Sequence, residues 1–166
     1  MIRMKLSRYV YTEQEFHQID ETPVYHQAVD SAVFKRGEEV ATVKYHPCHP
    51  NPDFEDYRKG EGTVWTKWLF SEDANKAEGL SECGINMFAD FYMEPGSSIG
   101  LHQHSDKEEI YYVLEGSVTM LVEDPEHGSS EVTLMPGDAH LVKLGQSHAA
   151  VASSEGARIV TVSVTR

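Results

Sequence analysis

Apolar residues occupy every second position over residues 85–93, and this alternation constrains the fold more than any other feature of the chain. The apolar positions are Ile85, Met87, Ala89, Phe91 and Met93. Successive side chains of a strand point to opposite faces, so the pattern predicts a half-buried strand whose odd residues face a core. Pro95 and Gly96 end this strand.

The chain after this strand consists of short strand-like runs separated by turn residues. The runs lie near residues 99–104, 109–115, 117–123, 131–135, 139–143, 147–152 and 158–165. The turn residues between them include Gly116, Pro125, Gly128, the Pro136–Gly137 pair, Gly145 and Gly156. Short strands at even spacing, with no helical pattern of useful length, predict an all-β sandwich or barrel. We place this β domain at residues 61–166.

The first part of the chain is less regular, and we expect residues 1–60 to form an N-terminal extension rather than a separate domain. Thr12 with Glu15 three positions later is a capping-box pattern that predicts a short helix. Residues 40–45 and 64–70 predict strands. The segment between them contains Pro47, Pro50 and Pro52, which exclude a regular element and predict a long loop. No internal repeat is visible.

A cluster of metal-ligand residue types follows the strand predicted over residues 85–93. His102 and His104 are two residues apart, so both side chains lie on one face of a strand. The polar segment Ser105 to Glu108 favours a turn. If it closes a hairpin with a four-residue loop, Glu109 lies directly across from His104, with Cβ atoms roughly 5 Å apart. Glu108 is the alternative carboxylate, and we expect it to face solvent.

The spacing of these residues resembles the first motif of the cupin family, G-x5-H-x-H-x4-E-x6-G. Gly96, His102, His104, Glu109 and Gly116 match every position. The second cupin motif, G-x5-P-x-G-x2-H-x3-N, is matched in part. Its matching positions are Gly137, Gly145 and the histidine His148, whereas Lys143 stands in place of the proline and Ala152 in place of the asparagine.

The resemblance implies a jelly-roll β-barrel of antiparallel strands that holds one divalent transition metal with His102, His104, Glu109 and His148. Three imidazoles and one carboxylate suit iron, manganese, nickel, cobalt or zinc. Four protein ligands leave two positions open on an octahedral ion, where a substrate or water can bind. The chain contains no phosphate loop or other organic-cofactor motif.

Function is less constrained than fold, because one fold supports many activities. We expect a metal-dependent enzyme that acts on a small, oxygen-chelating organic molecule, and we prefer dioxygenase-type chemistry. A sugar or sugar-phosphate isomerase or epimerase is the alternative within the enzymes. A non-catalytic module that binds or senses a small ligand is the alternative outside them.

Two residues near the expected metal are candidates for acid–base catalysis. Tyr111 shares a strand face with Glu109, and His140 lies between the two motifs on the same side as Val142. Packing alone also explains either side chain. Ala150 and Ala152 share a face with His148, and their small size leaves room beside the metal. A second metal at His46, Cys48 and His49 is less favoured than a stiff loop, because prolines interrupt that cluster.

Charge and composition exclude several classes of partner. The net charge of −13, from 14 basic and 27 acidic residues, disfavours nucleic acid and anionic membranes as partners. Two cysteines, Cys48 and Cys83, are too few for a disulfide framework. The N-terminal residues lack the apolar run of a signal peptide, so we expect a cytoplasmic protein. We also expect a homodimer in which the N-terminal extension helps to cover strand edges or the partner.

Overall fold

The computed structural model describes residues 40, 42–45, 60–71, 84–104 and 107–165. Within these residues every regular element is a strand, which confirms the all-β expectation. The strands are β1 (Thr42–Tyr45), β2 (Val64–Ser71), β3 (Ile85–Met93), β4 (Ser98–Gln103), β5 (Lys107–Asp124), β6 (Gly128–Leu134), β7 (Ala139–Val142) and β8 (Ser147–Thr165). The short helix expected near Thr12 and the His46–His49 loop lie outside the described residues.

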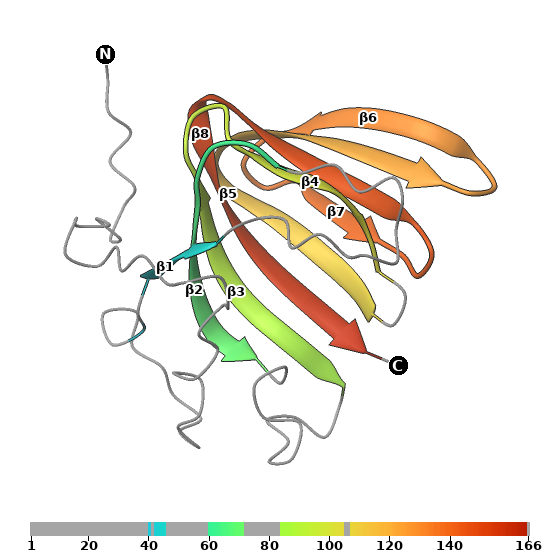
Figure 1. Cartoon of the computed structure of the whole chain (residues 1–166), viewed down its shortest axis with the longest axis horizontal. Coiled ribbons are helices and arrows are strands. Elements are labelled where there is room, and N and C mark those ends of the chain that lie inside the picture. The colour runs from blue at the N-terminus through green and yellow to red at the C-terminus, as the bar shows by residue number, and fades with distance from the viewer. Residues whose placement is uncertain (1–39, 41, 46–59, 72–83, 105–106, 166) are drawn as a thin grey trace.

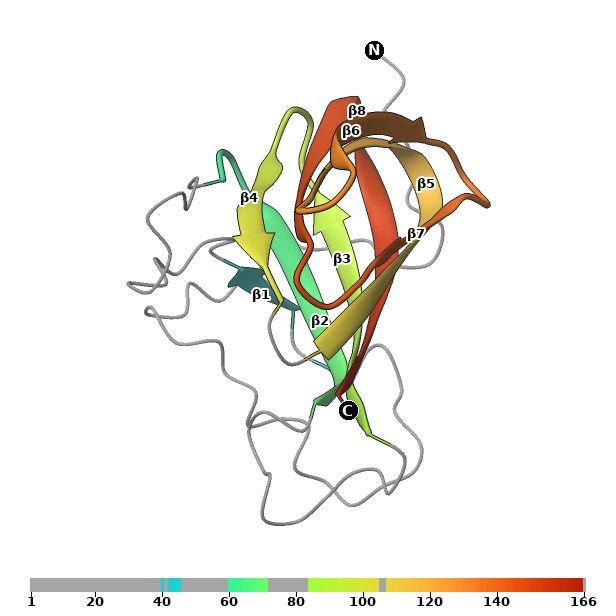
Figure 2. The ribbon, with the colours of Figure 1, turned by 90° about the vertical axis from the view of Figure 1, so that its right-hand side faces the viewer.

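Two long strands, β5 and β8, run through the whole fold and join its two sides (Figure 1). The first half of β5 pairs with β7 and with the last part of β8, while its second half pairs with β6 and the first part of β8. All of these pairings are antiparallel. The strands curve around a common interior, which gives the expected jelly-roll barrel (Figure 2).

Gly116 and Gly156 bend the long strands instead of ending them, which differs from the sequence-based expectation. Gly116 has a φ of 72° and Gly156 a φ of 85°, a conformation that other L-residues adopt at a cost. A Cβ atom at Gly116 would also collide with the carbonyl oxygen of Gly156. The two glycines therefore let β5 and β8 cross closely where the sheet changes direction.

The remaining part of the sheet extends from β8 through β3 and β2 to β1. Strand β1 lies within the segment expected to form the N-terminal extension, and it adds an edge to the sheet by pairing with β2. The core lies on the inner face of these strands. Trp68 and Phe91 meet edge-on with ring centroids 5.8 Å apart, and Phe91 and Tyr111 meet in the same way at 6.5 Å.

The predicted inward face of β3 is correct at four of its five positions. Met87, Ala89, Phe91 and Met93 are all buried. Ile85 is 43% exposed, so its predicted inward orientation is wrong. The register of β3 against β8 shifts between Ile85 and Met87, and one extra residue in a strand reverses the face of every residue before it.

Candidate metal centre

His102 and His148 meet across a pair of neighbouring strands. His102 lies near the end of β4, and it is the direct cross-strand partner of His148 near the start of β8. His104 follows the last residue of β4, so the two-residue spacing returns it to the same side as His102. The amide of Gly145 donates a hydrogen bond of 3.1 Å to the carbonyl oxygen of His104 and fixes the backbone there.

Glu109 reaches the same point from β5, although not by the route that the sequence suggested. The expected hairpin between β4 and β5 is not formed among the described residues, because β4 pairs with β8. In β5, Glu109 lies between Val142 of β7 and Ser163 of β8. It is 4% exposed, whereas the neighbouring Glu108 points to solvent. Barrel closure, not a local turn, brings the carboxylate to the histidines.

The ligand atoms of these four residues converge on one small volume, all within 4.8 Å of one another. The His148 Nε2 atom lies 3.1 Å from that of His102 and 3.2 Å from that of His104. A Glu109 carboxylate oxygen lies 3.2 Å from His104 Nε2 and 3.5 Å from His148 Nε2. Ligand atoms about 2.1 Å from one ion, at right angles, are roughly 3.0 Å apart. The donor set therefore fits a divalent transition metal.

Burial holds His102 and His148 in the neutral form, which is the form that binds metals. Burial, reinforced by repulsion from His148 and His104, lowers the pKa of His102 to about 3. Burial likewise lowers the pKa of His148. Burial alone would raise the pKa of Glu109, but hydrogen bonds from His104 and His148 outweigh it and lower this pKa well below its ordinary value.

A backbone contact orients the first histidine. The Nδ1 atom of His102 lies 2.8 Å from the carbonyl oxygen of Gly100. Because a carbonyl oxygen only accepts, the proton of the neutral ring lies on Nδ1, and the lone pair of Nε2 faces the centre of the cluster. Metal-binding histidines are commonly oriented in this way.

Both candidate acid–base residues lie beside the cluster, in one cross-strand row on the inner face. Tyr111 is directly across from His140 of β7 and from Thr161 of β8. The His148 ring centroid is 5.2 Å from that of Tyr111 and 5.6 Å from that of His140. Burial, with a smaller contribution from His148, lowers the pKa of His140 to about 4.

Thr161 is a candidate that sequence reasoning missed. It is fully buried on the inner face of β8, and its hydroxyl has no hydrogen-bond partner among the described residues. The Nε2 atom of His140 is also buried without such a partner. Thr161 is two residues after the apolar Ile159, so the alternation of side chains along a strand would have predicted that it faces the interior. Only the pairing of β5 with β8 shows that it lies opposite Tyr111.

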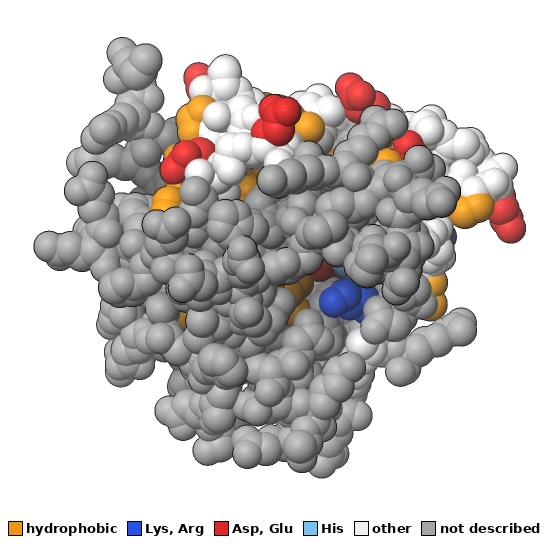
Figure 3. Space-filling view, in the orientation of Figure 1, with side chains coloured by type: hydrophobic (Ala, Val, Ile, Leu, Met, Phe, Trp, Pro, Cys, Tyr) orange, Lys and Arg blue, Asp and Glu red, His pale blue; other side chains and the backbone are white. Residues whose placement is uncertain are grey.

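The wall beside His148 is formed by small residues, as expected. Ala150 and Ala152 are 0% and 4% exposed and continue the inner face of β8. Lys107 lies on the inner face of β5, two residues before Glu109, and its side chain is half-buried. Figure 3 shows a basic side chain in a hollow at the centre of one face, next to a carboxylate and apolar side chains.

Comparison with known proteins gives a consistent family relationship. The sequence model described as the cupin domain matches residues 89–164. The oxalate-binding protein of Thermotoga maritima is 34% identical over 93 residues, which are 55% of this chain and 66% of that protein.

Solved structures show the same architecture. A predicted oxalate decarboxylase from T. maritima has a TM-score of 0.57 at 25% identity, covering 79% of this chain and 97% of that one. KdgF from Halomonas sp. has a TM-score of 0.50 at 20% identity, covering 70% of this chain and 91% of the other. An oxalate decarboxylase from Bacillus subtilis has a TM-score of 0.53 at 20% identity, covering 66% of this chain and 27% of that enzyme. The last two likenesses concern the fold alone.

None of the described elements is a helix with the length and hydrophobicity that a membrane span requires.

Proposed function

Residues 89–164 are a cupin domain, and from this premise we propose that the chain binds one divalent transition metal and, through it, a small chelating acid of the oxalate class. The convergence of three imidazole nitrogens and one carboxylate oxygen within 4.8 Å carries the proposal. Iron, manganese, nickel, cobalt and zinc all suit these ligands. Manganese is a natural first choice for testing, because the B. subtilis oxalate decarboxylase has Mn(II) centres.

The metal would supply Lewis acidity to the oxygen atoms of a bound acid. His102, His104, Glu109 and His148 hold the ion in this proposal, and the last three are buried. A two-carboxylate molecule as small as oxalate presents two oxygens to one ion, and the small side chains of Ala150 and Ala152 follow His148 on the same face of β8.

Lys107 supports an acidic ligand over a neutral one. The net charge of −13 repels anions from most of the surface, so an anion needs local positive charge. Lys107 is on the face of β5 that carries Glu109, one inward position away, or roughly 7 Å along the strand. Its ammonium group would attract the carboxylate that approaches the metal. A neutral sugar gains nothing from this charge, so Lys107 gives no support to an isomerase that acts on a neutral sugar.

The row of Tyr111, His140 and Thr161 would orient the ligand and move protons. At neutral pH the lowered pKa of His140 leaves its imidazole uncharged, so Nε2 can accept or donate one hydrogen bond. The hydroxyl of Thr161 offers a second such group. Decarboxylation of oxalate releases carbon dioxide and requires one proton at the remaining carbon to give formate. His140 or Tyr111 would deliver that proton in an enzyme of this class.

A non-catalytic binding protein is the second candidate, and the relationship to the T. maritima oxalate-binding protein favours it. In that case the same four ligands hold the metal and the same acid binds, but nothing is released. Dioxygenase-type chemistry remains a prediction, and it would use the same metal site.

The first experiment measures metal content and oxalate binding in the purified full chain. We expect about one metal per chain by elemental analysis, and saturable oxalate binding by calorimetry to the metal-loaded protein. The H102A/H104A variant should lose both. H127A is the matched control, because the His127 side chain is 79% exposed, pairs with Asp124 and is not one of the four clustered residues. Full metal occupancy in H102A/H104A would overturn the assignment.

The second experiment separates the two candidates. Carbon-13 oxalate is incubated with the metal-loaded protein, and formate and carbon dioxide are followed by nuclear magnetic resonance while oxygen uptake is recorded. Turnover that is lost in H140A and Y111F, with oxalate binding retained, supports the enzyme. Binding without turnover supports the binding protein. K107Q should weaken oxalate binding but leave metal content unchanged, and equal affinity in K107Q would contradict the role of the lysine.

A further inference from the structure

The outer face of the sheet opposite the metal carries a continuous row of apolar side chains. Phe70 of β2 is directly across from Phe88 of β3, and Phe88 is across from Val162 of β8. Val162 is across from Ile110 of β5, which is across from Leu141 of β7. Directly opposed side chains in a sheet lie on the same face, so five neighbouring strands contribute to one apolar row.

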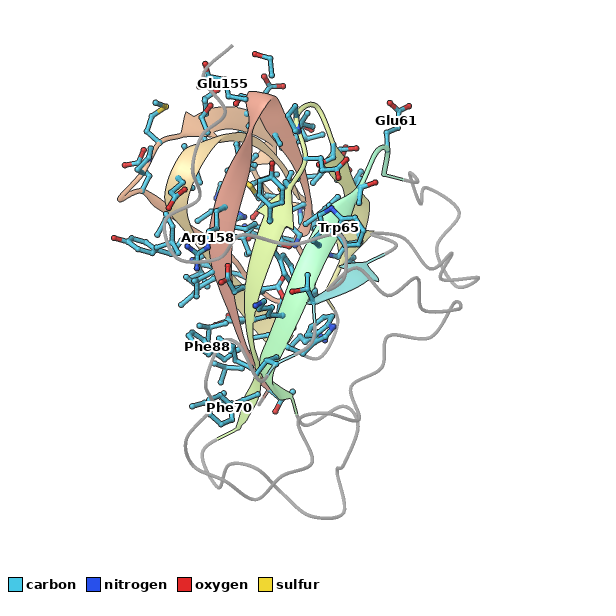
Figure 4. The ribbon with its side chains drawn as sticks, turned by 90° about the vertical axis from the view of Figure 1, so that its left-hand side faces the viewer. Glu61, Trp65, Phe70, Phe88, Glu155 and Arg158 are labelled. Carbon is cyan, nitrogen blue, oxygen red and sulfur yellow. The ribbon has the colours of Figure 1, made fainter. Side chains whose placement is uncertain are left out.

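Further apolar residues widen this row on both sides. Tyr112 lies on the same face of β5, two residues after Ile110, and Val164 pairs with Ile85 at the other side. The exposed side chains of the patch are Ile85 (43%), Ile110 (41%), Tyr112 (43%), Leu141 (44%) and Val164 (38%). In Figure 4, Phe70 and Phe88 lie along one side of the β2–β3–β8 ribbons, below Arg158. We call this surface the outer apolar face.

The charged groups beside the outer apolar face largely neutralise one another. Arg158 donates hydrogen bonds of 3.0 and 2.7 Å to the two carboxylate oxygens of Asp90, and both residues are buried. Glu115 lies 3.9 Å from the same guanidinium group. Glu108 is directly across from Val164 and adds one exposed carboxylate to this face. A strongly acidic or basic partner would therefore find little net charge to pair with.

The area of the face matches one half of a stable interface. Large side chains present roughly 150–250 Å² when extended, so five of them at about two-fifths exposure leave on the order of 400 Å² of apolar surface. A patch of this size is comparable to the largest apolar patch of a typical monomer, and such patches are often functional. Each half of a standard interface contributes roughly 800 Å², of which a little over half is apolar, or about 450 Å².

We propose that the outer apolar face is the dimer interface and that a second copy of this chain covers it. A second copy presents the same neutral, apolar surface, and a two-fold axis makes one such patch complementary to itself. This pairing joins sheet faces, whereas the sequence analysis expected the N-terminal extension to help cover strand edges or the partner. It also places the second copy against the outer side of β5 and β8, the strands that carry Glu109 and His148.

The position of the axis follows from the order of the row. Val162 is its middle residue, so an axis near Val162 brings Ile110 against Phe88 of the second copy and Leu141 against Phe70 of the second copy. The aliphatic end of each row then meets the aromatic end of the other. Two twisted sheets packed in this way lie about 10 Å apart.

The test is sedimentation equilibrium of the full metal-loaded chain and of single charge substitutions. L141E and I85E place a carboxylate at opposite sides of the face, where the second copy would bury it against apolar side chains without a partner of opposite charge. We expect a wild-type dimer and a dissociation constant at least about a hundredfold higher in both variants. V132E is the matched control, because Val132 is 50% exposed on β6, away from the face, and this variant should dimerise like the wild type.

Several outcomes would overturn the proposal. A monomeric wild type excludes the second copy, and a lower melting temperature of L141E than of V132E in that case would assign the face to a segment of the same chain. Dimers that persist in both L141E and I85E place the interface elsewhere. Dissociation of V132E as well would show that the effect is one of added charge. Metal content and circular dichroism identify any variant that fails to fold, and Leu141→Gln then replaces Leu141→Glu.

Discussion

The buried histidine cluster should make the metal-free protein sensitive to mild acid. The pKa of His102 is about 3 in the folded protein, against an ordinary value near 6.5 in the unfolded chain. Between these two values the unfolded chain binds more protons than the folded one, so stability falls as the pH is lowered. The contribution is fully present above about pH 6.5 and is lost progressively as the pH falls toward the folded-state value of about 3.

The magnitude follows from the two pKa values. Lowering the pH from about 7 to about 5 should reduce the free energy of unfolding by about 2 kcal/mol through His102 alone. The ring is half-buried, so solvent screening makes this an upper value. His148, whose pKa burial also lowers, adds in the same direction. In a domain of this size, about 2 kcal/mol corresponds to roughly 4–8 °C in melting temperature.

The assay is urea unfolding of the metal-free protein at several pH values, for the wild type, H102Q and H127Q. H102Q should lose less stability on acidification than the wild type, by up to about 2 kcal/mol. H127Q changes an exposed histidine and should behave like the wild type. Equal acid sensitivity of H102Q and the wild type would refute the reasoning, because the buried neutral imidazole would then contribute nothing to the pH dependence.

Three further predictions concern other parts of the structure. D90N removes the carboxylate that accepts both hydrogen bonds of the buried Arg158 and leaves only Glu115, at 3.9 Å, as an anion beside it. The change should cost up to about 3–5 kcal/mol in urea unfolding, with D90N/R158M less affected than the sum of the single changes. G116A should lower the free energy of unfolding more than G96A does. Both glycines have positive φ, but only a Cβ atom at Gly116 would collide with backbone atoms, and chemical denaturation of the two variants measures the difference. Removing the metal with a chelator should lower the melting temperature, and metal at about 100 times its dissociation constant should restore about 2.7 kcal/mol.

The sequence by itself determined the strands and the chemistry of the centre. Side-chain alternation is a property of a few consecutive residues, so it revealed the inner positions of β3 from Met87 to Met93. The two-residue spacing of His102 and His104 likewise showed that both side chains lie on one face of the chain. These conclusions hold because each depends on backbone geometry over a short stretch of chain.

The tertiary structure decided how those stretches meet. His102 and His148 are 46 residues apart, and only the β4–β8 register makes them neighbours. The bulge that turns Ile85 outward depends on how β3 fits β8, so the alternation could not reveal it. Pairing between distant strands is set by closure of the whole barrel rather than by local preference. For that reason the opposition of Thr161 to Tyr111, and the joining of five strands into one outer apolar face, appear only in the folded chain.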